Sequence, residues 1–202
     1  MPDVARLSRD EQRARTRADL LAAAATVFAR TGYHASSVDM VAEAAGYTKG
    51  AVYSNFASKE DLFLALLDEH VDQAVETLEE IVASTDPAAR AQLLGARREE
   101  MQVFDRDWHL LETEFVLYAA RNERVRALMA ERQQRTRARI ADLLRRHLGD
   151  VGADAPIDLE DLARILIATG DGLTVMSVAE PDTDGGRLMG MVLHLLEQAL
   201  AR

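Results

Sequence analysis

Apolar residues recur at helical spacing along nearly the whole chain. The first such face lies between residues 9 and 30 and consists of Leu20, Leu21, Ala24, Val27 and Phe28. Residues 59–83 carry a longer apolar stripe, with acidic residues on the opposite face. No segment shows the sustained alternation of apolar and polar residues that is typical of strands, and the chain has only four prolines. The pattern predicts an all-α protein of about nine helices.

Polar capping residues and glycines set the expected helix boundaries. Ser8 and Glu11 form a capping box at the start of the first helix, and Gly46 supplies the positive φ on which many helices end. The other expected caps are Ser36 or Ser37, Thr48, Ser58, Asp86, Asp107 and Asp158. These signals predict helices over residues 9–30, 37–45, 48–55, 58–83, 87–104, 107–120, 123–148, 158–179 and 187–201, and one clear loop over residues 149–158.

Composition excludes several classes of protein. The 202 residues are 48% hydrophobic and include no cysteine, which excludes disulfides and thiolate metal sites. The chain starts without the apolar run of a secretory signal and has no uninterrupted stretch of about 18 apolar residues. We therefore expect a cytoplasmic protein that does not contact a membrane. His109/Glu112 and His194/Glu197 have i, i+3 spacing. Two isolated pairs are weak evidence, so we expect no metal and no cofactor.

The negative charge is confined to one part of the chain. Residues 1–63 hold eight Lys or Arg and eight Asp or Glu, so the whole net charge of −10 belongs to the remaining residues. The larger C-terminal part would repel a polyanion, but the N-terminal part would not. A second basic segment, "RQQRTRAR" at residues 132–139, is either a solvated helical face or a second nucleic-acid site.

The segment around Gly46 has the pattern of a helix-turn-helix. Ala42 lets two helices approach, Gly46 makes the turn, and Val52 points inward to anchor the second helix. The opposite face of that helix carries Thr48, Lys49, Tyr53, Ser54 and Asn55. Hydroxyl, amide and ammonium donors of this kind bind phosphates, and such a helix fits the major groove. Gly50 has no side chain, so the backbone there can lie close to DNA.

The runs "SSVDMVAEAAG", "TKGAVYSNF" and "SKEDLF", preceded by "FARTGYHA", make this segment specific. Over about residues 20–66 the chain strongly resembles the TetR (tetracycline-repressor-like) family of transcriptional regulators. The resemblance implies a DNA-binding domain over residues 1–57 and a ligand-binding and dimerisation domain over residues 58–202. It also places Ser37 and Lys59 at DNA-contacting positions. The expected DNA-binding residues are Ser37, Thr48, Lys49, Gly50, Tyr53, Ser54, Asn55 and Lys59.

The aromatic residues of the C-terminal part gather within 15 positions. They either belong to the core or line an apolar ligand pocket, and the two interpretations overlap. The candidate ligand-binding residues are Met101, Phe104, Trp108, Leu111, Phe115, Tyr118, Met129 and Met176.

The last two expected helices, residues 158–179 and 187–201, are apolar on nearly all sides. Their apolar faces are buried either within one chain or in a dimer; in the resembling family, these helices form the dimer interface. We therefore interpret the protein as a homodimeric repressor that binds a palindromic double-stranded operator and is released by a small apolar effector. The alternatives are an effector-independent regulator or activator, a helical enzyme, and a protein-interaction module.

Overall fold

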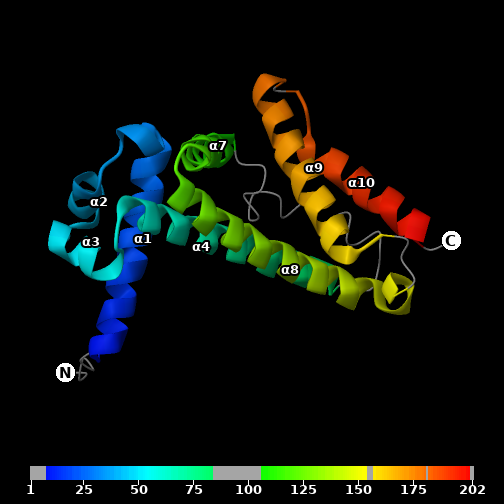
Figure 1. Ribbon diagram of the computed structural model, residues 1–202, viewed down its shortest axis with the longest axis horizontal. Coiled ribbons are helices and arrows are strands. Elements are labelled where there is room, and N and C mark those ends of the chain that lie inside the picture. The colour runs from blue at the N-terminus through cyan, green and yellow to red at the C-terminus, as the bar shows by residue number, and fades with distance from the viewer. Residues whose placement is uncertain (1–7, 84–105, 154–156, 181, 201–202) are drawn as a thin grey trace, which may run out of the picture. The chain divides into compact units, whose positions relative to one another are not determined.

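The computed structural model describes residues 8–83, 106–153, 157–180 and 182–200 (Figure 1). All regular structure in these ranges is helical, which confirms the all-α class. The helices are α1 (Arg9–Ala35), α2 (Val38–Ala45), α3 (Lys49–Asn55), α4 (Lys59–Val82), α7 (Arg106–Ala120), α8 (Glu123–Ala153), α9 (Leu159–Ala179) and α10 (Gly185–Leu200). The helix expected over residues 87–104 lies outside the described residues, as do the candidates Met101 and Phe104.

The chain divides within α4 into two compact units, Met1–Asp68 and Glu69–Arg202. The first unit begins with the predicted capping box. The Ser8 hydroxyl accepts a hydrogen bond from the Glu11 backbone at 3.2 Å, and the Ser8 backbone donates to the Glu11 carboxylate at 2.7 Å. At Gly32, φ is 75° and ψ is 166°, which interrupts the helical path near the predicted end of the helix.

The helix-turn-helix forms as the sequence predicts. Ser37 caps α2 and Thr48 caps α3, each accepting a backbone hydrogen bond on its side-chain oxygen. Gly46 adopts the left-handed conformation with φ 71° and ψ 25°, and its N–H donates to carbonyls in the last turn of α2. A side chain in this conformation would cost about 1–2 kcal/mol. The chain therefore turns sharply enough to place α2 and α3 against each other.

Apolar side chains from all four helices hold the first unit together. Val52 is 1% exposed and anchors α3, as predicted. The rings of Phe28 and Tyr33 each pack edge-on against Phe63 at 5.1 Å between centroids, and Phe56 is also buried. This aromatic core fixes the inner face of the helix-turn-helix, so the opposite face of α3 is left for other contacts.

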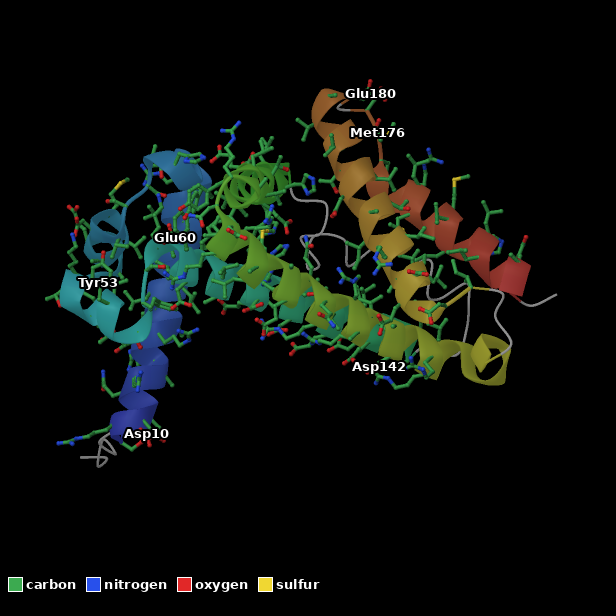
Figure 2. All side chains as sticks on the ribbon, viewed as in Figure 1. Asp10, Tyr53, Glu60, Asp142, Met176 and Glu180 are labelled. Atoms are coloured by element: carbon green, nitrogen blue, oxygen red, sulfur yellow. The ribbon has the colours of Figure 1, made fainter. Side chains whose placement is uncertain are left out.

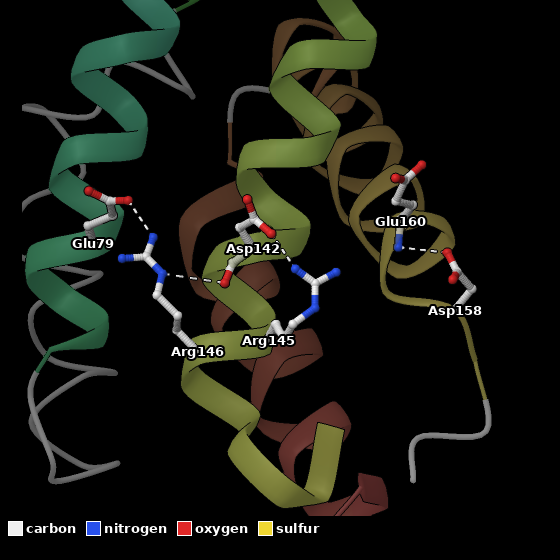
Figure 3. Close-up of polar contacts among 6 residues, drawn as sticks. All are labelled: Glu79, Asp142, Arg145, Arg146, Asp158 and Glu160. Atoms are coloured by element: carbon white, nitrogen blue, oxygen red, sulfur yellow. Dashed lines mark hydrogen bonds and ion pairs between the residues drawn. The ribbon is translucent and has the colours of Figure 1, made fainter. Parts of the chain in front are cut away.

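In the second unit, α8 packs against α7 and α9, and α9 packs against α10. Two ion pairs join α8 to α4: Arg139 with Asp72, and Arg146 with Glu79 at 2.7 Å (Figure 3). Because both pairs occur in the same order along the two helices, α4 and α8 run in the same direction. The first pair also neutralises one arginine of the basic segment at residues 132–139.

Three boundaries in the second unit differ from the prediction. α8 continues to Ala153, so Gly149 and Gly152 are helical although we expected a loop from residue 149. One interior glycine costs a helix only about 1 kcal/mol, which packing elsewhere along 31 residues can offset. Asp107 lies inside the first turn of α7 rather than capping it. α10 begins at Gly185, where the Asp184 carboxylate accepts a hydrogen bond from the Arg187 backbone at 3.0 Å.

The helices α9 and α10 leave a row of large apolar side chains exposed. These are Ile165, Val175, Met176, Met191 and Leu195. Within α9, a Cβ at Gly170 would lie 3.5 Å from the Met189 methyl group of α10, which is an ordinary van der Waals distance, so the packing there does not require glycine. α9 is long and apolar enough to cross a membrane, by length and composition only. Within the chain, 22% of that stretch is buried. The apolar faces are thus not covered by the described part of a single chain.

Candidate nucleic-acid interface

The outward face of α3 gathers most of the predicted DNA-binding residues. Tyr53 lies on α3 (Figure 2) and is 50% exposed, and Lys49 and Ser54 are also exposed. A Cβ added to Gly50 would meet only the Thr48 hydroxyl, at 3.7 Å. The backbone at Gly50 is therefore accessible to a close partner, as expected at the start of a recognition helix.

The capping hydroxyls keep a donor for an external partner. Ser37 accepts a hydrogen bond from the Met40 backbone at 3.3 Å, and Thr48 accepts one from the Ala51 backbone at 3.2 Å. A hydroxyl has one hydrogen in addition to its two lone pairs. Both caps can therefore hold their helix and also donate to a phosphate oxygen.

The two polar residues at the end of α3 are committed to the helix itself. The Ser54 hydroxyl donates to the Ala51 carbonyl at 2.8 Å, and the Asn55 amide donates to the same carbonyl at 2.9 Å. Short polar side chains on a helix often donate to a carbonyl three or four residues earlier in this way. Ser54 and Asn55 would have to change partners to contact DNA through these donors.

Lys59 is turned into the protein rather than toward α3. Its ammonium group donates to the Ser36 carbonyl at 2.6 Å and to the Tyr33 carbonyl, and it lies 4.4 Å from the centroid of the Tyr33 ring. Burial lowers the pKa of this lysine. The contacts tie the first turn of α4 to the connection between α1 and α2, and contact of Lys59 with DNA stays a prediction.

An ion pair on this face joins α2 to α3. The Lys49 ammonium lies 2.8 Å from the Asp39 carboxylate, which belongs to the first turn of α2. The hydrogen bond and charge of Asp39 raise the pKa of Lys49. Both groups are largely exposed, so water and salt screen their attraction, but the two charges cancel at this point of the surface.

The predicted ligand-binding residues of the second unit fall into two groups. Leu111, Phe115 and Met129 are buried, and Tyr118 packs beside Phe115 at 5.9 Å between ring centroids. Trp108 stacks on His70 of α4 at 4.1 Å. By contrast, Met176 lies exposed among the apolar residues of α9. The structure therefore places Trp108 against α4, pairs Phe115 with Tyr118 on α7, and leaves Met176 at the surface.

Charged side chains from three helices meet beside these apolar residues. Burial and the negative charge of Asp171 on α9 raise the pKa of Glu112 on α7 to about 7, and Arg132 on α8 opposes that shift. His109 is buried one turn before Glu112. Burial raises the pKa of Asp171, and the nearby His109 partly opposes that rise. Among the described residues, no three His, Cys, Asp or Glu side chains form a group that could hold a metal.

Family models match both parts of the chain. The model described as "Bacterial regulatory proteins, tetR family" covers residues 20–66, and "BetI-type transcriptional repressor, C-terminal" covers residues 101–201. The first match spans the helix-turn-helix, and the second covers half of the chain. The chain belongs to the TetR family of transcriptional regulators.

Relatives within the TetR family differ in how much of the chain they match. The transcriptional activator FasR of Mycolicibacterium smegmatis is 42% identical over 40% of this chain and 35% of its own length. The repressor AcnR of Corynebacterium diphtheriae is 28% identical over 91% of this chain and 90% of its own. The crystal structure of FadR from Bacillus subtilis in complex with stearoyl-CoA covers 89% of this chain and 96% of its own, with 22% identity and a TM-score of 0.68.

Two contacts of this TetR-family helix-turn-helix were not predicted from the sequence. Arg17 of α1 donates to the Asn55 carbonyl at 3.2 Å, and its guanidinium carbon lies 4.4 Å from the Phe56 ring centroid. Tyr47, in the turn, donates its hydroxyl hydrogen to Asp19 at 2.8 Å. Both link α1 to the end or start of α3 across at least 28 positions, so no local sequence signal identifies them. They position α3 rather than extend its outward face.

Proposed function

We propose that the protein is a cytoplasmic, homodimeric repressor that binds a palindromic operator through α3 and has no enzymatic activity. In this proposal residues 1–57 contact DNA, and residues 58–202 bind an effector and form the dimer. The observation that carries it is the anchored α3, with Val52 buried on one side and Lys49 and Tyr53 exposed on the other. Such a helix enters the major groove with its N-terminal residues nearest the bases.

The relatives favour repression over activation. AcnR, named a repressor, aligns over 91% of the chain, whereas the activator FasR aligns over only 40%. In the proposed mechanism the dimer holds two α3 helices at the spacing of successive major grooves, roughly 34–36 Å. An effector that binds better to another arrangement lowers operator affinity by that difference in affinity.

Selection of bound fragments from random DNA, followed by titration of the selected site, tests DNA binding. We expect the double variant Lys49→Ala/Tyr53→Ala to bind the selected site about 10- to 100-fold more weakly, because each good contact is worth about 1–3 kcal/mol. Arg135→Ala, an exposed charge of α8, is the control and should bind as the wild type does. Unchanged affinity in the double variant would refute the role of α3.

The exposed apolar face of α9 and α10 supports the dimer. An uncovered patch of this kind typically marks an interaction surface. Of the two interpretations of these helices, burial within one chain does not account for the exposed Leu195 and Val175. An isologous interface between two copies covers the same residues on both chains. It also explains why α9 is apolar enough to resemble a membrane span.

An apolar effector is expected to bind near Trp108, Phe115 and Tyr118. FadR binds stearoyl-CoA, whose acyl chain is apolar. The three aromatic side chains named here all lie on α7 and would offer an apolar surface to such a ligand. Since Trp108 is the only tryptophan, a releasing effector should change its fluorescence at the concentrations that dissociate DNA. Saturating operator should weaken effector binding by the same factor. If Phe115→Ala and Trp108→Phe both leave the affinity for a releasing effector unchanged, the pocket lies elsewhere.

A further inference from the structure

An acidic side chain lies within the face proposed to contact DNA. Asp39 belongs to the first turn of α2, and its carboxylate is 2.8 Å from the ammonium of Lys49, the first residue of α3. The side chains are 63% and 54% exposed. The pair therefore lies at the surface where the starts of α2 and α3 meet, beside the capping hydroxyls of Ser37 and Thr48. A carboxylate at this place is unfavourable for any contact with phosphate alone.

The charge of Lys49 determines how strongly this surface attracts DNA of any sequence. Binding that depends on phosphates alone gains affinity from each cation that releases a counterion. Asp39 cancels that gain locally, because the pair carries no net charge. We propose that Asp39 is a specificity-determining residue, which withholds Lys49 from phosphates and makes binding depend on base contacts. The inference rests on the proposed function and adds a residue that opposes non-specific binding.

The chemistry of the pair also indicates which bases satisfy it. In the major groove a lysine donates to O6 and N7 of guanine, and a carboxylate accepts from the N4 amino group of cytosine. A G·C pair at the start of α3 offers partners to both side chains at once. A phosphate offers the carboxylate no donor. An A·T pair offers the adenine amino group as a donor but only one acceptor on each base, adenine N7 or thymine O4, whereas guanine offers the lysine O6 and N7 together. We therefore expect selected sites to contain G·C pairs at the position read by Lys49 and Asp39.

The experiment compares Asp39→Asn with the wild-type full-length protein on a selected site and on random-sequence DNA over a series of salt concentrations. Asparagine keeps the size of the side chain and a cap-compatible polar group but removes the charge. One additional effective cation should steepen the salt dependence on random DNA by about one and tighten that binding about fivefold at 0.15 M salt. The selected site should gain no affinity, so the ratio of specific to non-specific affinity should fall about fivefold or more.

Two further variants separate this role from a structural one. Glu160→Gln makes the same charge change at the second residue of α9 and should leave both affinities unchanged, which excludes an effect of net charge alone. Asp39→Glu keeps the charge and should retain the selectivity of the wild type. The inference is overturned if Asp39→Asn leaves the salt dependence on random DNA unchanged, or if it tightens binding to both DNAs equally. A wild-type protein that binds no DNA would instead refute the proposed function, and this inference with it.

Discussion

Replacing Leu195 with glutamate is expected to convert the dimer into folded monomers. Leu195 is 62% exposed on α10, so a carboxylate there is solvated in a single chain and should not disturb its fold. In the proposed dimer the same carboxylate would be buried without a partner on both chains, at a cost of about 3 kcal/mol or more for each uncompensated charge. We expect the dimer dissociation constant to rise at least about 100-fold.

Sedimentation velocity at micromolar concentration measures this change, and circular dichroism checks that the helices persist. Leu117→Glu is a matched control, since Leu117 is 57% exposed but lies on α7. That variant should remain dimeric. Operator affinity should fall together with dimerisation, because a monomer contacts only one half-site. A dimeric Leu195→Glu protein, or dissociation caused by Leu117→Glu instead, would place the interface on another surface.

The parts of the structure that local chemistry decides were predicted correctly. The Ser8 capping box, the left-handed Gly46, the Thr48 cap and the buried Val52 each depend on residues within a few positions of one another. The end of α8 was predicted wrongly because two glycines were interpreted as a loop, although their local cost is small relative to the packing of a long helix.

The contacts that modify the candidate interface join distant positions. Arg17 reaches Asn55 across 38 positions, and Lys59 reaches Tyr33 across 26. Their partners depend on how α1 crosses α3 and α4, which periodicity does not specify. A lysine expected at the DNA is therefore found bonded to carbonyls, and an arginine on α1 supports the recognition helix. Chemistry identified the types of residue at the interface, but only packing shows which donors remain available.

The environment of Glu112 could not be predicted from the sequence either, because side chains from three helices form it. Burial and the nearby Asp171 raise the pKa of Glu112 from 4.5 to about 7. Between these two pH values the folded protein binds more protons at this site than the unfolded chain does. The free energy of unfolding therefore decreases as pH rises through this window, and the loss is complete above about pH 7. The partly buried carboxylate destabilises the protein when it is ionised.

Glu112→Gln should remove this pH dependence, because glutamine resembles the protonated form at every pH. A shift of one pKa unit corresponds to about 1.4 kcal/mol, so we expect the variant to be about 1–3 kcal/mol more stable than the wild type at pH 8. At pH 5, where the wild-type carboxyl is largely protonated, the two proteins should differ little. Urea unfolding at both pH values and at equal protein concentration measures the difference. Asp107→Asn, an exposed acid on the same helix, is the control and should show the same pH dependence as the wild type. Parallel stability profiles for Glu112→Gln and the wild type between pH 5 and pH 8 would show that Glu112 is solvated and ionised in the folded protein.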